Sequence, residues 1–163
     1  VRISFTWDPA KARKSLGKKR VAFDEAESVF YDDRARLVDD PDHSDSERFI
    51  LLGVSHALRV LVVVHAYRES DTVIHIISVR KATPQERTAY DEQGARHEKE
   101  YDFSRSRPNP YAARLKRAVT IRLDEPTITY FKALATETGI GYQTLINSFL
   151  RDCAAAKRGP TVR

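Results

Sequence analysis

The sequence Lys116–Pro126, K-R-A-V-T-I-R-L-D-E-P, decides how the C-terminal part of the chain folds. Val119, Ile121 and Leu123 alternate with small or polar residues, which predicts a β-strand with one apolar face. Nothing nearby in the chain resembles a partner strand, and a lone strand of this length would leave its backbone edges open. The stretch therefore predicts pairing with the same strand of a second copy.

Two amphipathic helices are predicted after this strand. Asp124 is a suitable N-cap and Pro126 suits a first helical turn. Apolar residues recur at helical spacing over residues 127–138, which Gly139 ends, and over residues 142–157. A strand and two helices in about 40 residues bury too little surface to fold well alone. The order predicts a ribbon-helix-helix dimer, whose two-stranded ribbon enters the major groove of DNA.

Residues for DNA contact follow from this arrangement. The candidates, on the outer face of the ribbon, beside it and at the start of the second helix, are Ala118, Thr120, Arg122, Lys116, Arg117 and Thr144. Arg122 can pair with guanine O6 and N7, worth about 1–3 kcal/mol of discrimination, whereas Ala118 offers only an apolar contact. The others are positioned for phosphate or base-edge contacts. The alternative is a dimerisation ribbon with no role in DNA binding.

The basic charge of the chain lies in its C-terminal part. Residues 1–92 hold 15 of the 28 Lys and Arg and 16 of the 23 Asp and Glu, a net charge of −1. Residues 93–163 carry a net charge of +6. Phosphate binding requires such an excess, although a merely soluble basic tail would show it too.

The first 92 residues predict an α+β domain. Residues 60–64 are all β-branched or Leu, so they are predicted to form a central strand covered on both faces. The predicted elements are a strand at 3–7, a helix at 9–19 capped by Asp8, a helix opened by a capping box of Asp24 and Glu27, strands at 35–39, 48–54, 59–66 and 73–79, and a helix at 84–92 opened by Thr83 and Pro84.

Several motifs resemble a known pair of families. The stretch from Lys116 to Ala155 resembles the BrnA antitoxins. F-T-W-D-P-A-K-A, D-P-D-H-S-D-S-E-R-F and I-I-S-V-R-K-A-T-P-Q-E-R-T-A-Y-D-E, all within residues 1–92, resemble the BrnT toxins. The resemblance implies a RelE-like toxin domain at 1–92, with helices on an antiparallel sheet, an extended linker or neutralising segment at 93–115, and a ribbon-helix-helix domain at 116–159.

The segment between the two domains has no apolar periodicity and is predicted to be extended. A flexible linker is one interpretation. However, Tyr101, Phe103 and Tyr111 are unusual in an inert linker, which gains nothing from apolar side chains. The resemblance favours docking of these three aromatic residues onto the toxin domain.

The resemblance to BrnT implies a metal-independent endoribonuclease, inhibited in the full chain. Such toxins neutralise the charge of the phosphorane with cations and move protons with acid–base groups. The candidate catalytic residues are, in order, Arg80, Arg68, Lys18, Arg48 and His65. Each has an ordinary alternative, because an Arg or Lys at the end of a strand or helix is usually solvated or ion-paired. The histidines lack metal-ligand spacing, so no metal and no cofactor are predicted.

Two departures from the family pattern predict weakened or lost toxin activity. Lys18-Lys19-Arg20 stands where the family usually has Lys-His-Gly, and His75 stands where it often has Arg. Three hypotheses remain open. The first is a fused toxin–antitoxin, neutralised within the chain or across a dimer, that represses its own operon. The second is a catalytically dead toxin-like domain on a repressor, and the third is an active ribonuclease with vestigial DNA binding.

The expected partners are operator DNA, an RNA substrate and a second copy of the chain. No run of eighteen apolar residues and no apolar signal-peptide core is present, which predicts a cytoplasmic protein without a membrane partner. The single Cys excludes an internal disulfide.

Overall fold

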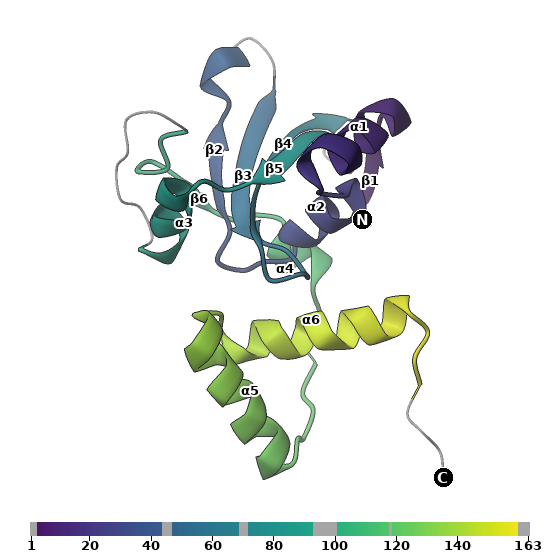
Figure 1. Cartoon of the computed structure of the whole chain (residues 1–163), viewed down its shortest axis with the longest axis vertical. Helices are drawn as coiled ribbons and strands as arrows, with labels where there is room; N and C mark the ends of the chain where they lie inside the picture. The colour runs from purple at the N-terminus through teal and green to yellow at the C-terminus, as the bar shows by residue number, and fades with distance from the viewer. Residues whose placement is uncertain (1–2, 44–46, 69–71, 93–100, 118, 160–163) are drawn as a thin grey trace. The chain divides into compact units, whose positions relative to one another are not determined.

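The computed structural model describes residues 3–43, 47–68, 72–92, 101–117 and 119–159, which form two compact units, Val1–Arg117 and Ala118–Arg163. Figure 1 shows their elements. The elements of the first unit are β1 (Ser4–Trp7), α1 (Pro9–Lys19), α2 (Phe23–Val29), β2 (Arg36–Asp39), the short 3-10 helix η1 (Pro41–His43), β3 (Arg48–Val54), β4 (Val60–Arg68), β5 (Val73–Lys81), α3 (Pro84–Asp91), β6 (Arg107–Pro108) and α4 (Ala112–Leu115). The second unit holds α5 (Glu125–Thr138) and α6 (Tyr142–Ala155).

The first unit is an α+β domain built on a six-stranded sheet of order β1-β5-β4-β3-β2-β6. The pairings β2–β3, β3–β4 and β4–β5 are antiparallel, but β1 runs parallel to β5. The prediction of a wholly antiparallel sheet is therefore wrong. Strands joined by a hairpin must run antiparallel. β1 is not joined to β5 in this way, because three strands and two α-helices lie between them in the chain, so the two can run parallel.

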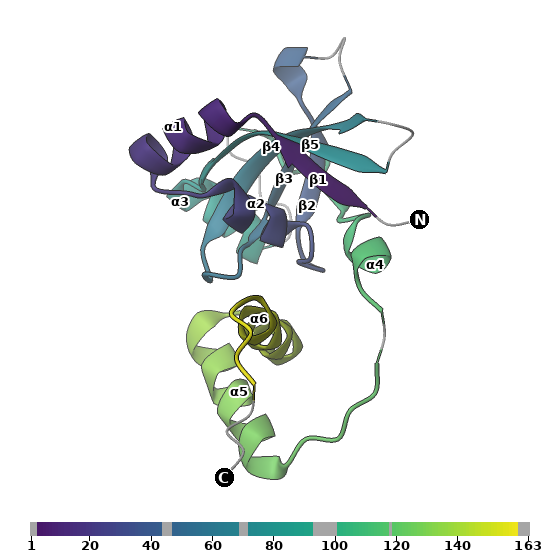
Figure 2. The same cartoon turned by 90° about the vertical axis from the view of Figure 1, so that its right-hand side faces the viewer.

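The helices of the first unit cover both faces of the sheet. α1 and α2 lie on one face, and α3 lies on the other (Figures 1 and 2). The core under α1 and α2 includes Phe30, Leu51 and Ile76, each with no exposed surface. β4 is central and is buried on both faces from Leu61 to His65, as its apolar run predicts.

Local signals set the ends of two helices as predicted. Asp8 caps α1 by accepting hydrogen bonds from the amides of Ala10 (2.7 Å) and Lys11 (3.2 Å). Thr83 and Glu86 form the predicted capping box of α3. The predicted capping box at the second helix is wrong, because α2 begins at Phe23 after the N-cap Ala22 and has no side-chain cap. Phe23 is 3% exposed, so its packing into the core places it inside the helix.

Residues 101–117 belong to the first unit and contain β6 and α4. Phe103 is 2% exposed and Tyr111 has no exposed surface. An inert linker does not describe these residues. The predicted linker also includes residues 93–100, which lie outside the described residues.

The second unit follows the predicted helical pattern. Asp124 caps α5 by accepting a hydrogen bond from the amide of Thr127 (2.8 Å), and Gly139 ends it with a φ of 71°. The rings of Phe131 and Phe149 join α5 to α6, with centroids 6.1 Å apart. Residues 119–124 form no strand in the single chain that the structure describes. Their predicted partner is the same segment of a second copy.

No helix among the described residues has both the length and the apolar character needed to cross a membrane.

Candidate functional site

Basic side chains gather on the sheet face opposite to α1 and α2. Residues paired across neighbouring strands point to the same face, and one paired row contains Arg48, Ala66, His75 and Thr6 on β3, β4, β5 and β1. Arg68, two residues after Ala66 on β4, shares this face. We call the face that carries Arg48, Arg68, His75 and Arg80 the basic face.

A β-bulge is needed to bring Arg80 to the basic face. Residues five positions apart on a regular strand point to opposite faces, so Arg80 and His75 would be separated. The register between β4 and β5 shifts between Val64 and His65, and Arg80 pairs with Val62 on the same face as Ala66. The bulge therefore brings both basic residues of β5 to one face.

Arg80 has two partners on this face. Its guanidinium donates to both carboxylate oxygens of Glu86 at 2.7 Å, and the Glu86 side chain is 2% exposed. The Arg80 guanidinium carbon also lies 5.7 Å from the centre of the Tyr101 ring. The residue ranked first for catalysis is thus ion-paired within the toxin-like part and contacted by an aromatic ring of the segment that follows, although its side chain is still 34% exposed.

His75 is held in place on the basic face by β1. Its Nδ1 lies 3.0 Å from the Thr6 hydroxyl oxygen, so a hydrogen bond between β5 and β1 orients the ring. Burial, followed by the positive charges of Arg68 and Lys11, lowers the pKa of His75 below 6.5, and Asp8 opposes this. From the sequence, His75 was interpreted as a change that weakens the toxin. Its contact with Thr6, 69 residues away in the chain, could not be predicted from the residues around His75.

His65 lies on the other face and is part of the core. It has no exposed surface, and its Nε2 is 2.7 Å from the Tyr111 hydroxyl. Burial lowers the pKa of His65 to about 3. A side chain in this position cannot reach RNA, so we correct its predicted catalytic role to a packing role. Tyr111, the buried aromatic residue that encloses His65, lies 46 residues further along the chain.

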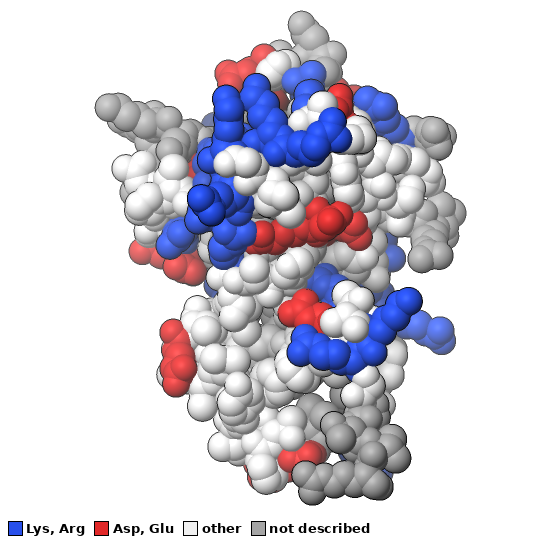
Figure 3. Space-filling view, turned by 45° about the vertical axis from the view of Figure 1, so that its right-hand side comes forward, with Lys and Arg blue, Asp and Glu red and all other residues white. Residues whose placement is uncertain are grey.

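Lys18 also lies apart from the basic face. It is exposed in the last turn of α1, seven residues and therefore about 10 Å beyond Lys11 along the helix. It is one of two basic residues in that turn, and Figure 3 shows a band of Lys and Arg side chains on this face of the first unit. The structure thus places three of the five catalytic candidates, Arg48, Arg68 and Arg80, on one face, with Arg80 opposite Val62, four residues along β4 from the row that contains Arg48.

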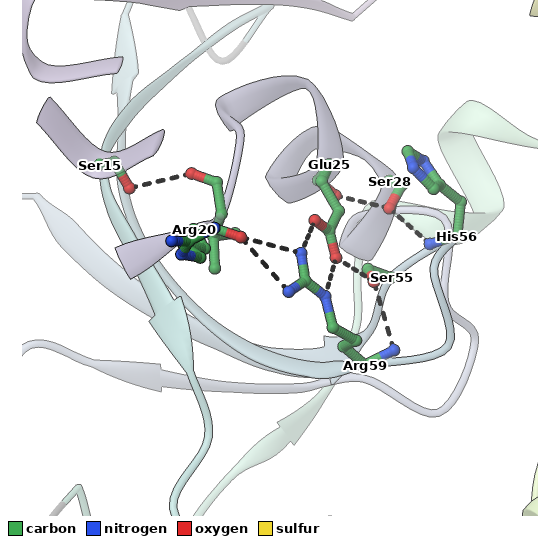
Figure 4. Close-up of polar contacts among 8 residues, drawn as sticks. Ser15, Arg20, Glu25, Ser28, Ser55, His56 and Arg59 are labelled. Carbon is green, nitrogen blue, oxygen red and sulfur yellow. Dashed lines mark hydrogen bonds and ion pairs between the residues drawn. The ribbon is translucent and has the colours of Figure 1, made fainter. Parts of the chain in front are cut away.

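An ion-pair network anchors the two helices at the end of the sheet (Figure 4). Arg59 forms a bidentate ion pair with the buried carboxylate of Glu25, and its guanidinium also donates to the Arg20 carbonyl at 3.3 Å. Ser55 donates to Glu25 at 2.7 Å. Burial alone would raise the pKa of Glu25, but the hydrogen bonds from Arg59 and Ser55 lower it overall. The network ties the β3–β4 turn to α2 and to the end of α1.

Residues 101–117, which we call the docking segment, wrap around the β2 edge of the sheet. Tyr101 lies on the basic face, and β6 pairs with β2 through Arg107 and Leu37. Tyr111 then packs on the opposite face, where its ring contacts those of Phe30 and His65. One segment therefore contacts both faces and extends the sheet by a strand.

Asn109 fastens the docking segment at the point where it changes face. Its side-chain amide donates to the carbonyl oxygens of Phe30 (2.9 Å) and Asp32 (2.7 Å), and its Oδ1 accepts from the Tyr111 amide (2.9 Å). Lys116, at the end of the segment, forms an ion pair with Asp33 at 2.7 Å. The predicted phosphate contact of Lys116 competes with this ion pair.

The remaining DNA-contact candidates lie in or beside the second unit. Thr120 and Arg122 are exposed, as is Arg117 at the end of the first unit, and Ala118 lies outside the described residues. The Thr144 amide already donates to the Gly141 carbonyl at 2.9 Å. Among the residues that the structure describes, no group of three or more His, Cys, Asp or Glu is placed to hold a metal ion.

Two family profiles match the chain and divide it near β5 and α3. The ribonuclease toxin BrnT of type II toxin–antitoxin systems matches residues 7–86, and the BrnA antitoxin of type II toxin–antitoxin systems matches residues 78–154. The chain is therefore a type II toxin–antitoxin protein with both partners in one polypeptide. Its first part belongs to the BrnT toxin family and its second part to the BrnA antitoxin family.

A solved structure is also similar to the first part. The crystal structure of the Brucella abortus ribonuclease toxin BrnT matches with a TM-score of 0.41 and 19% sequence identity, over 50% of this chain and 97% of the other. No curated protein sequence matches the chain.

Proposed function

We propose that this chain is a self-neutralised toxin–antitoxin protein. A RelE-like ribonuclease domain cleaves RNA on its basic face, and the docking segment blocks that face in the intact chain. The ribbon-helix-helix part dimerises and binds operator DNA, so that the protein represses its own operon. The observation that carries this proposal is the Tyr101 ring over the Arg80 guanidinium.

Cation chemistry supports RNA cleavage on the basic face. Arg48, Arg68 and Arg80 share one face of a rigid sheet, and such preorganised cations stabilise the charge that develops on a phosphorane. The Tyr101 ring lies against the Arg80 guanidinium and takes up space that the sugar or base of an RNA bound at this arginine would need. The docking segment thus reduces activity without any change in the fold.

Expression in bacterial cells tests the neutralisation. The intact chain is expected to leave growth unaffected, whereas a Tyr101→Ala/Asn109→Ala chain should arrest growth, because it uncovers Arg80 and loosens the segment. Adding Arg80→Ala to the double variant should restore growth. Growth arrest by the intact chain would argue against neutralisation by the docking segment.

Dimerisation through the predicted ribbon is supported by exposed apolar side chains. Val119 and Ile121, on the apolar side of the predicted strand, are 73% and 55% exposed, and Phe149 of α6 is 55% exposed. Covering them requires a second copy under the ribbon-helix-helix plan.

DNA binding is tested through Arg122. We expect Arg122→Ala to abolish the preference for operator over unrelated DNA in an electrophoretic mobility assay. The ratio of the two affinities should fall by about 10- to 100-fold. Arg117→Ala, which removes a predicted phosphate contact, should instead weaken binding to both DNAs equally. An unchanged ratio in Arg122→Ala would exclude base reading by this residue.

A second candidate function is a repressor that carries an inactive toxin-like domain. The Arg80–Glu86 ion pair favours it, because this pair lies within the toxin-like part and occupies Arg80 even without the docking segment. The Tyr101→Ala/Asn109→Ala chain separates the two candidates: a folded double variant without toxicity indicates the inactive domain.

A further inference from the structure

The paired row across the basic face contains a gap between two basic side chains. Arg48 and His75 stand on the strands that flank β4, and the residue between them is Ala66. Adjacent strands are spaced by about 4.8 Å, so the two backbones lie about 9.6 Å apart across this small residue. Side chains on either side can therefore reach towards one group held above Ala66.

The surrounding residues suit an anionic group at that position. Arg68 follows on the same face of β4 and is exposed, and Arg48 and His75 are half-buried. Lys11 on α1 adds a further positive charge near His75, and Asp8 at the helix N-cap is the acidic residue that acts on it. Among the described residues, the charged groups that act on His75 are therefore two cations and one anion.

We propose that His75 is the general base of an RNA-phosphate site on the basic face, with Arg48 and Arg68 binding the scissile phosphodiester. This inference rests on the proposed ribonuclease function and adds the residue that moves the proton. The tautomer that this role requires has Nδ1–H donating to the Thr6 hydroxyl oxygen, 3.0 Å away, so that Nε2 carries the lone pair that accepts the proton.

The step balances without a cofactor. Nε2 of His75 takes the proton of the RNA 2′-hydroxyl while the 2′-oxygen forms a bond to phosphorus and the P–O5′ bond breaks. The departing 5′-oxygen takes a proton from water, and the imidazolium returns its proton to the resulting hydroxide. The products are a 2′,3′-cyclic phosphate and a 5′-hydroxyl. Arg48 and Arg68 neutralise the non-bridging oxygens as charge builds up.

His75 thereby supplies a function that an arginine at the same position could not. An arginine stays protonated at all physiological pH values, so it binds phosphate but accepts no proton. Burial and the neighbouring cations lower the pKa of His75, which keeps its imidazole neutral and basic at pH 7.

The phosphate site is tested first on the Tyr101→Ala/Asn109→Ala chain, in which the basic face is open, by NMR titration of the histidine rings with and without a 2′-O-methyl RNA hexamer, which cannot be cleaved. We expect the hexamer to raise the pKa of His75, because a phosphate anion favours the imidazolium. Arg68→Ala should weaken hexamer binding about 10-fold. A His75 titration that the hexamer leaves unchanged would overturn the site, whatever the nuclease assays give.

The proton-transfer role is tested in the Tyr101→Ala/Asn109→Ala chain with a cleavable RNA. Cleavage should fall at acid pH with the pKa that NMR gives for His75. It should drop at least 100-fold in His75→Gln and stay unchanged in His56→Gln, a control histidine in the β3–β4 turn. Cleavage that persists in His75→Gln would overturn the proposal that His75 is the general base, while the proposed ribonuclease function would stand. Absence of cleavage in every chain would overturn the ribonuclease and the general base together, even if the hexamer still bound.

Discussion

Removing one oxygen atom from Tyr111 should destabilise the first unit. Tyr111→Phe keeps the ring, and with it the edge-on contacts to Phe30 (5.1 Å between centroids) and His65 (5.4 Å). It removes the hydroxyl that lies 2.7 Å from His65 Nε2, in a site with no exposed surface. Because the imidazole nitrogen would then be buried without this partner, we expect a loss of about 1–3 kcal/mol in the free energy of unfolding.

Urea denaturation followed by tryptophan fluorescence measures this loss. Trp7 is the only tryptophan of the chain and lies in β1, so its signal reports on the first unit. Tyr101→Phe is the matched control, since it removes a tyrosine hydroxyl from the same segment while the ring over Arg80 stays. The control should change stability by less than about 0.5 kcal/mol.

The two variants together decide whether the docking segment is part of the folded domain. Equal stabilities of Tyr111→Phe and the unchanged chain would refute the reasoning, because a docked Tyr111 hydroxyl cannot be lost without cost at a buried nitrogen. Amide hydrogen exchange at Tyr111 and Leu115, whose amides donate to Asn109 Oδ1 and the Tyr111 carbonyl, gives an independent readout. Exchange there should accelerate in Tyr111→Phe and not in Tyr101→Phe.

Three further predictions concern the stability of the first unit. Gly53→Ala should cost about 3 kcal/mol in urea denaturation, because its Cβ would lie 2.6 Å from the Ala35 Cβ; a neutral result would contradict the packing. Arg20→Gly should raise the melting temperature, by a stabilisation of about 1 kcal/mol or less, because Arg20 has a φ of 53°, where glycine is favoured; a lower melting temperature would contradict this. Below pH 6.5 the unfolded chain protonates His65 while the folded chain keeps it neutral, so stability should fall with pH by up to about 1.4 kcal/mol per unit; ring resonances of His65 that titrate near pH 6 would exclude this.

The sequence predicted those features whose causes are local. The apolar run at residues 60–64 predicted the buried central strand, and Asp8, Thr83 and Asp124 predicted three helix starts, because a cap acts within one turn. The start of α2 was missed because a core residue, Phe23, outweighs a polar cap.

The composition of the basic face depends on contacts between distant residues. His75 and Arg80 share the face because of a β-bulge in the pairing of β5 with β4. The sequence of β5 alone does not predict this bulge. His65 was taken for an acid–base residue because it stands near the end of an apolar strand. The burial of His65 becomes evident only from the structure, in which Tyr111, 46 residues later, packs against it.

The central claim is that the docking segment restrains a ribonuclease. The most direct test is cleavage of a structured RNA by the purified intact chain, by the Tyr101→Ala/Asn109→Ala chain, and by that chain with Arg80→Ala. We predict no cleavage by the first, cleavage by the second and loss of cleavage in the third. A double variant that folds, releases the segment by hydrogen exchange and still leaves the RNA intact would contradict the account.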